Sequence, residues 1–139
     1  MVNAYSTDVG SFENWATLAY DHPRIGRVRG KYFLGERLGL SAMEVSLNSL
    51  PAGVRMPFAH KHREHEELYV FLAGEGEMQV DDQLFRVGCG SAIAVRPDGV
   101  RTWRNTGSVP LVYLVIQASS REGLVRGIED GVPAELPAQ

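Results

Sequence analysis

The side chains best suited to chemistry are gathered in one short segment of the chain. Three of the four histidines, His60, His62 and His65, fall within six residues. They are interleaved with Glu64, Glu66 and Glu67. Imidazole suits Zn, Fe, Ni and Cu, and a carboxylate extends the choice to Mn. Two imidazoles and one carboxylate on one side of an ion leave positions open for water or substrate. The segment therefore indicates a metal site, with a charged, solvated loop as the alternative.

A β-strand would bring such ligands together. Residues two apart on a strand point the same way, so His60 and His62 would converge on one ion. A carboxylate on the same or the next strand would complete three ligands. By the same parity, His65 should face the other way. His22 is remote in sequence from this segment, so it is only an outside candidate.

The middle of the chain has β character. Met43, Val45 and Leu47 alternate with polar residues, which is the period of a half-buried strand. The apolar run Leu68–Leu72 suits a buried strand. Further strands are predicted at 77–80, 84–87, 92–95 and 111–116. Gly, Pro, Asn and Asp divide them at intervals of about ten residues, a spacing that predicts an antiparallel sandwich or barrel.

The two ends of the chain are less regular. Ser11 is a candidate cap for a short helix with Phe12, Trp15, Ala16 and Ala19 on one face, and His22-Pro23 would end it. A second short helix is predicted over 119–130. The basic stretch from Arg24 to Lys31 is interpreted as a solvated face, with a role in holding an anion as the alternative.

The histidine segment resembles the first motif of the cupin family, G-x5-H-x-H-x3,4-E-x6-G. The sequence fits this motif from His60 and His62 through Glu67 to Gly74, and Gly53 precedes His60 by one residue more than the motif has. The resemblance implies that His60, His62 and Glu67 are the metal ligands and that Glu66 points away. It covers about residues 38–117.

The second cupin motif, G-x5-P-x-G-x2-H-x3-N, is matched only in part. Pro97 and Gly99 are present, Asn105 stands one residue early, and the histidine is missing. Thr102 or Arg101 takes its place, depending on the end from which the count starts. Two readings remain: a three-ligand metal site that is more open near Thr102, or a pocket without metal. The first is favoured because three polar ligands are costly in a barrel mouth unless they bind something. His65 could replace the missing ligand.

The resemblance implies an all-β fold, an antiparallel double-stranded β-helix or jelly-roll-like barrel. The barrel would span 38–117, between extensions at 1–37 and 118–139. One divalent ion (Fe, Mn, Zn or Ni), a small-molecule ligand and a homodimer are expected. The reaction would be that of a dioxygenase or an isomerase, and a non-catalytic ligand-binding or sensor domain is the alternative. The candidate pocket residues are Tyr69, Met78, Arg101, Thr102 and Trp103.

Composition excludes other classes of partner. A net charge of −3 over 139 residues is too small to predict a nucleic-acid or membrane partner. No apolar run approaches the ~20 residues that cross a bilayer. The first ten residues do not read as a signal peptide. Cys89 is the only cysteine, so no internal disulfide is expected and a cytoplasmic location is predicted.

Overall fold

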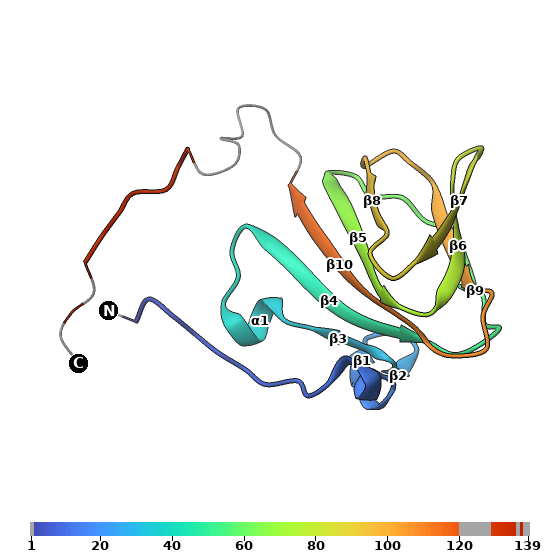
Figure 1. Cartoon of the computed structure of the whole chain (residues 1–139), viewed down its shortest axis with the longest axis horizontal. Coiled ribbons are helices and arrows are strands. Elements are labelled where there is room, and N and C mark those ends of the chain that lie inside the picture. The colour runs from blue at the N-terminus through green and yellow to red at the C-terminus, as the bar shows by residue number, and fades with distance from the viewer. Residues whose placement is uncertain (1, 120–128, 136, 138–139) are drawn as a thin grey trace.

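Two antiparallel sheets lie face to face in the computed structural model, which describes residues 2–119, 129–135 and 137 (Figure 1). The five-stranded sheet has the order β3-β4-β10-β5-β8. Its strands are β3 (Lys31–Phe33), β4 (Met43–Leu50), β10 (Leu111–Ser119), β5 (His65–Ala73) and β8 (Ala92–Val95). The three-stranded sheet is formed by β7 (Gln83–Gly88), β6 (Glu75–Val80) and β9 (Arg101–Asn105), in that order. The predicted all-β antiparallel barrel is confirmed.

The barrel core lies between the two sheets. Alternate residues of β5 and β10 point inward, so Tyr69 and Phe71 are fully buried and meet Tyr113 and Val115. Met78 from β6 and Trp103 from β9 close the core from the other sheet. This apolar interior fills one end of the barrel, and polar side chains line the other.

From Ser46 to Leu50, strand β4 is buried on both of its faces, which corrects the prediction of a half-buried strand. Its polar residues Ser46 and Asn48 are 3% and 2% exposed and face the barrel interior, where Asn48 pairs with Tyr113 of β10. Its apolar residue Leu47 lies on the outer face, where Trp15 covers it. Alternation alone could not tell which face is interior, because a short N-terminal element covers the outer face.

That element is the 3-10 helix η1 (Phe12–Thr17), which Ser11 caps as expected through Glu13 N. The predicted helix extended to Ala19, but the chain becomes extended at Leu18. Residues from Ala19 form a hairpin of β1 (Ala19–His22) and β2 (Gly26–Arg29). His22 stabilises the turn of this hairpin, because its Nδ1 accepts hydrogen bonds from the backbone N–H groups of residues 24 and 25. A four-residue helix, α1 (Gly35–Leu38), joins β3 to β4.

Gly74, the last residue of the first motif, turns the chain from β5 into β6. Its φ is +84°, in the left-handed region. A Cβ at this position would collide with the backbone of Pro110 and Leu111. Glycine is therefore required here for both backbone conformation and close packing.

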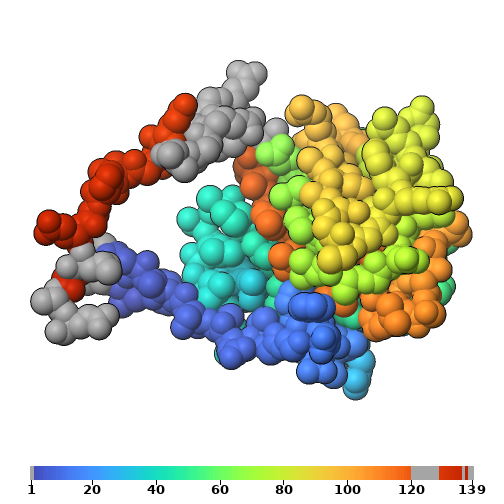
Figure 2. Space-filling model, in the orientation of Figure 1, coloured from blue at the N-terminus to red at the C-terminus, as the bar shows by residue number. Residues whose placement is uncertain are grey.

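The predicted strands of the middle region correspond to β4, β5, β6, β7, β8 and β10, whereas β3 and β9 were not anticipated. The predicted helix at 119–130 falls largely outside the described residues. Residues 129–135 lie apart from the two sheets (Figure 2). None of the helices in the described part of the chain is long and apolar enough to span a membrane. The division at residues 37 and 117 stays a prediction.

Candidate functional site

Glu67 lies at the centre of the polar end of the barrel. It is on the inward face of β5, two residues before Tyr69, and its side chain is only 6% exposed. The Tyr69 hydroxyl donates a 2.7 Å hydrogen bond to Glu67 Oε1. A buried carboxylate requires such partners, and this one also fixes the orientation of the carboxyl group.

His60 and His62 reach Glu67 from a segment that is not a strand. The expectation that a strand would place them on one face is wrong: β5 begins only at His65. Backbone hydrogen bonds hold the segment instead. His60 exchanges N–H···O bonds of 3.0 and 2.9 Å with Arg101, and His62 N donates to Pro97 O at 3.0 Å. The chain that carries the histidines is thus attached to the loop and strand opposite.

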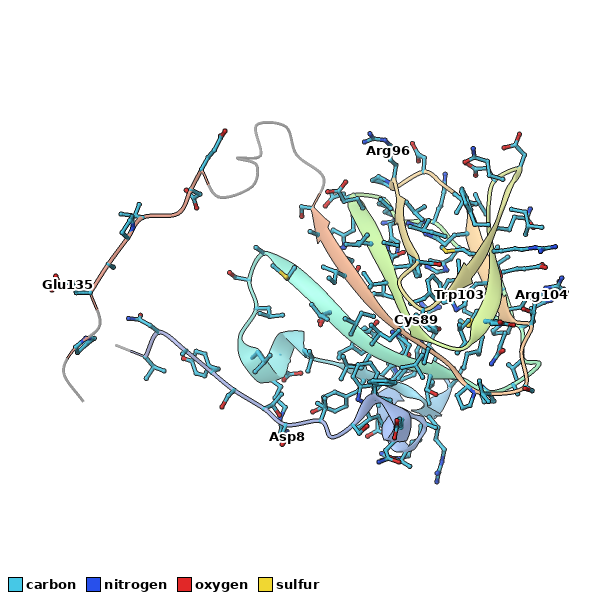
Figure 3. All side chains as sticks on the ribbon, viewed as in Figure 1. Asp8, Cys89, Arg96, Trp103, Arg104 and Glu135 are labelled. Atoms are coloured by element: carbon cyan, nitrogen blue, oxygen red, sulfur yellow. The ribbon has the colours of Figure 1, made fainter. Side chains whose placement is uncertain are left out.

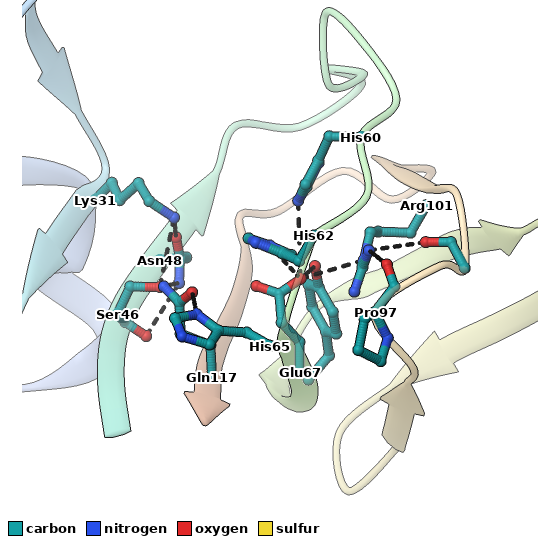
Figure 4. Close-up of polar contacts among 12 residues, drawn as sticks. Lys31, Ser46, Asn48, His60, His62, His65, Glu67, Pro97, Arg101 and Gln117 are labelled. Atoms are coloured by element: carbon teal, nitrogen blue, oxygen red, sulfur yellow. Dashed lines mark hydrogen bonds and ion pairs between the residues drawn. The ribbon is translucent and has the colours of Figure 1, made fainter. Parts of the chain in front are cut away.

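The three side chains converge on one point (Figure 4). Glu67 Oε1 is 3.2 Å from His62 Nε2 and 3.7 Å from His60 Nε2, and one ligand atom from each residue lies within 4.8 Å of the other two. Ligands bound at about 2.0–2.2 Å from one ion have separations near these values. His62 Nε2 is buried and has no hydrogen-bond partner among the described residues. A buried, unpartnered imidazole nitrogen facing a carboxylate fits a metal ligand.

The charge states also suit metal binding. Burial alone would raise the pKa of Glu67, but the contacts with His60 and Tyr69 and the charges of His62 and Arg101 hold that pKa at about 2. Burial lowers the pKa of His62, although the Glu67 carboxylate opposes this. Glu67 is therefore ionised and His62 tends to be neutral at physiological pH, which are the forms that bind metal.

Comparison with known proteins identifies the family. A family model for the cupin domain matches residues 47–117, just over half of the chain. The chain belongs to the cupin family. An uncharacterized protein of Methanocaldococcus jannaschii, MJ1618, is 40% identical to this cupin over 55 residues, which are 40% of this chain and 44% of that protein. The match thus spans less than half of that relative's length.

Solved structures support the same fold. The cupin protein BF4112 of Bacteroides fragilis superposes with a TM-score of 0.79 at 27% identity, covering 97% of this chain and all of that one. TT1209 of Thermus thermophilus has a TM-score of 0.59 at 18% identity and covers 81% of this chain and 98% of its own. A putative sugar phosphate isomerase of Acidithiobacillus ferrooxidans has a TM-score of 0.58 at 24% identity, covering 65% and 58% of the two chains. The last two show the fold alone.

Arg101 points into this cupin's site at the position of the missing histidine. It is fully buried, with its Nε 3.2 Å from Glu67 Oε1. Nη1 donates to Gly99 O at 2.7 Å and to Pro97 O at 3.4 Å. The contact with Glu67 is an ion pair without hydrogen-bond alignment, and Arg101 Nε and Nη2 lack hydrogen-bond partners among the described residues. A guanidinium thus faces the carboxylate where many cupins have a fourth ligand.

Thr102, the other residue counted to that position, is on the opposite face of β9. Burial alternates along this strand, so Arg101, Trp103 and Asn105 face inward, whereas Thr102 and Arg104 lie on the other side. Thr102 and Arg104 line a surface pocket. Figure 3 shows Trp103 inside the barrel and Arg104 at its periphery.

Three of the candidate pocket residues form the apolar base below the cluster. The Tyr69 and Trp103 rings lie 5.1 Å apart, and His60 packs edge-on to Trp103 at 6.1 Å. Trp103 Nε1 donates a 2.8 Å hydrogen bond to the Tyr113 hydroxyl. Met78 pairs with Trp103 across the sheet and is fully buried. These buried side chains form an apolar layer next to the polar residues.

His65 lies on the same face of β5 as Glu67, contrary to the parity expectation. That expectation counted from His62 along a strand, but the residues between them are not a strand. The His65 ring is 6.2 Å from the His62 ring, and its Nδ1 is 2.9 Å from Gln117 Oε1. An open depression is lined by residues 61–65, which include His62 and His65. Glu66 is exposed, as expected.

Sequence reasoning missed the polar residues on the far side of the site. They are Lys31, Ser46, Asn48 and Gln117. The sequence predicts that Ser46 and Asn48 lie on the polar face of a half-buried strand. It places Lys31 in a basic stretch interpreted as solvated, with a role in holding an anion as the alternative. The only sequence signal was their spacing of two residues, which places Ser46 and Asn48 on one face but does not say that this face is interior.

Replacing Arg101 by methionine tests how much its ion pair with Glu67 contributes to the stability of the folded protein. Removing the cation leaves Glu67 buried without its charged partner, so the free energy of unfolding should fall by about 3 kcal/mol. The measurement is urea denaturation in the presence of a chelator, so that bound metal does not contribute.

Arg104→Met is the matched control. Arg104 pairs with Glu77 at 2.7 Å on the surface, where its side chain is 44% exposed, so the loss should stay below about 1 kcal/mol. Equal losses in the two variants would contradict the assignment of a buried, structurally required ion pair.

Proposed function

We propose that this cupin binds one divalent metal ion through His60, His62 and Glu67 and binds a small molecule in the barrel mouth. The convergence of two imidazole nitrogens and one carboxylate oxygen, with His62 Nε2 buried and unpartnered, carries the proposal. The donor set suits Fe, Mn, Zn or Ni. An ion bound by three protein ligands keeps open positions, at which it would serve as a Lewis acid or, as iron, in oxygen chemistry.

The surrounding residues prepare this site. Tyr69 holds Glu67 in one orientation by its hydrogen bond. Trp103 packs beside His60 and excludes water from below. The His60 and His62 side chains are 31% and 27% exposed, so a small molecule can approach the cluster from solvent. A dioxygenase or isomerase reaction is consistent with this arrangement.

Arg101 favours a second candidate function, non-catalytic binding of a small ligand. It already gives Glu67 a counter-charge, so the cluster is electrostatically compensated without an ion. Under this second candidate function, the barrel would act as a carrier or a sensor of the small ligand. Stoichiometric metal distinguishes the first candidate from a metal-free binding barrel, and oxygen uptake or substrate turnover by the loaded protein distinguishes enzyme from sensor.

Elemental mass spectrometry of the untagged protein tests the metal directly. We expect about one ion per chain, lost in His60→Ala/His62→Ala because two of three ligands are gone. His22→Ala, which removes the histidine of the β1–β2 turn, should keep the ion. If no ion is retained even after anaerobic reconstitution with Fe, Mn, Zn and Ni, the metal proposal is wrong.

Arg101→His should strengthen metal binding. It removes a positive charge beside the ion and offers a third imidazole. We expect at least about a tenfold gain in affinity, measured by competition with a chromophoric chelator. Arg104→His, the same substitution on the outer face of β9, should leave affinity unchanged. An unchanged or lower affinity in Arg101→His would show that Arg101 does not stand at a ligand position.

We infer a homodimer through the outer face of the five-stranded sheet, at the end that η1 leaves uncovered. Leu68 is 38% exposed and Met43 46% exposed, and Val70 and Ile116 are only partly buried. A second copy would cover this apolar face. Leu68→Glu should shift the sedimentation equilibrium from dimer to monomer, whereas Leu84→Glu, at a 64% exposed site on β7, should not. A monomeric wild-type protein would contradict this inference.

A cytoplasmic location stays a prediction.

A further inference from the structure

A second polar cluster lies inside the barrel, across from the histidines. Lys31 of β3 pairs with Asn48 of β4, and its Nζ donates to Asn48 Oδ1 at 2.9 Å and to Ser46 Oγ at 3.4 Å. The same Nζ lies 5.1 Å from the centre of the Phe33 ring. Figure 4 shows Lys31 pointing toward Asn48 and Ser46, on the side of the site opposite Arg101. The family match begins at residue 47, so Lys31 and Ser46 lie outside it.

The groups around Lys31 stabilise its charged ammonium group. Asn48 Nδ2 donates to Ser46 O at 3.1 Å, to Ser46 Oγ at 3.0 Å and to Tyr113 O at 3.4 Å. These bonds fix the Asn48 amide so that its oxygen faces the ammonium. The face of the Phe33 ring adds a cation–π contact. All of these partners are neutral, so they support the charge of Lys31 without cancelling it.

The neighbouring carboxylates have other partners. Glu44 is on the same face of β4 as Ser46, but its Oε1 accepts from Gly35 N at 2.7 Å and Val45 N at 2.9 Å. Glu67 is paired with Arg101. Within the described residues, none of the ion pairs shorter than 4.0 Å includes Lys31. The Lys31 ammonium is partly buried and has only neutral hydrogen-bond partners, so it can take an anion as a further partner.

Spare hydrogen-bond donors lie next to this charge. An ammonium has three N–H groups, and Asn48 and Ser46 accept only two of them. The Ser46 hydroxyl oxygen accepts from both Lys31 and Asn48, so its own O–H is free to donate. Burial lowers the pKa of Lys31 to about 8, while the Glu67 charge acts to raise it, so the amine remains mainly protonated at pH 7.

We propose that Lys31 and Ser46 form an anchor for the carboxylate group of the small molecule that this barrel binds. One ammonium and one hydroxyl match the two oxygens of a carboxylate. No arginine of the cluster offers the additional donors that a phosphate would use. The other end of the ligand then faces His60, His62 and Glu67. This inference rests on the proposed small-molecule function but not on the presence of metal.

Isothermal titration calorimetry with sodium malonate tests the anchor, with sodium chloride as the ionic-strength control. The chelator-treated protein is used first, so that the metal site does not contribute. We expect malonate to bind the wild-type protein, and Lys31→Met to weaken binding by at least about tenfold because a charged hydrogen bond is lost. Ser46→Ala should weaken it by a smaller factor and keeps the proposal testable if Lys31→Met fails to fold.

The chain offers one matched control, because Lys31 and Lys61 are its only lysines. Lys61 is 61% exposed and lies 3.7 Å from Asp98 on the surface. Lys61→Met should bind malonate within about twofold of the wild type.

Three results would overturn the inference: no malonate binding, equal binding by Lys31→Met, or tighter binding of inorganic phosphate than of malonate. If malonate binds only after metal loading and Lys31→Met does not change this binding, the metal proposal stands and the proposed Lys31 anchor is wrong. If malonate binds through Lys31 but the protein never takes up metal, the anchor stands and the metal proposal is wrong.

Discussion

The carboxylate of Glu67 is buried inside a barrel, and the site is arranged around this constraint. Removing an ionised carboxylate from water is costly unless donors and cations replace the water. Tyr69 supplies a donor, Arg101 a permanent charge, and His60 and His62 polar contacts on the third side. Tyr69 lies on the same strand as Glu67, whereas Arg101 comes from β9 and the histidines from the segment before β5, so the contacts of Glu67 join the two sheets.

Arg101 makes this cupin different from one with four metal ligands. A guanidinium beside Glu67 balances its charge whether or not an ion is bound, so the barrel has no need of metal for electrostatic compensation. The same charge repels an incoming cation, and it occupies the side from which a fourth ligand would come. We infer a site in which metal binds more weakly and more reversibly than in a four-ligand cupin, and in which the ligand contributes more to holding the ion.

Lys31 and Arg101 lie on opposite sides of the site; Arg101 is buried and Lys31 is partly buried. Arg101 is paired with Glu67, whereas Lys31 is held by neutral groups. In the proposed binding mode, this asymmetry would orient a ligand with its anionic end at β3 and β4 and its other end at the histidines. Strand β3 places Lys31 at the edge of the five-stranded sheet, beside Asn48 of β4.

The sequence by itself determined the six strands β4, β5, β6, β7, β8 and β10, the turns between them and the three candidate ligands, because each depends on residues close together in the chain. Gly74, for example, follows Glu67 by a fixed spacing and ends the same strand. Only the tertiary structure decided which faces are interior. Alternation along β4 does not distinguish its two faces. In the structure Trp15 covers the outer face at Leu47, and Ser46 and Asn48 are buried on the inner face. His60 and His62 converge through backbone bonds to Arg101 and Pro97, and Lys31 reaches the site by pairing with Asn48. Such contacts join residues that are distant in sequence, and local periodicity carries no information about them.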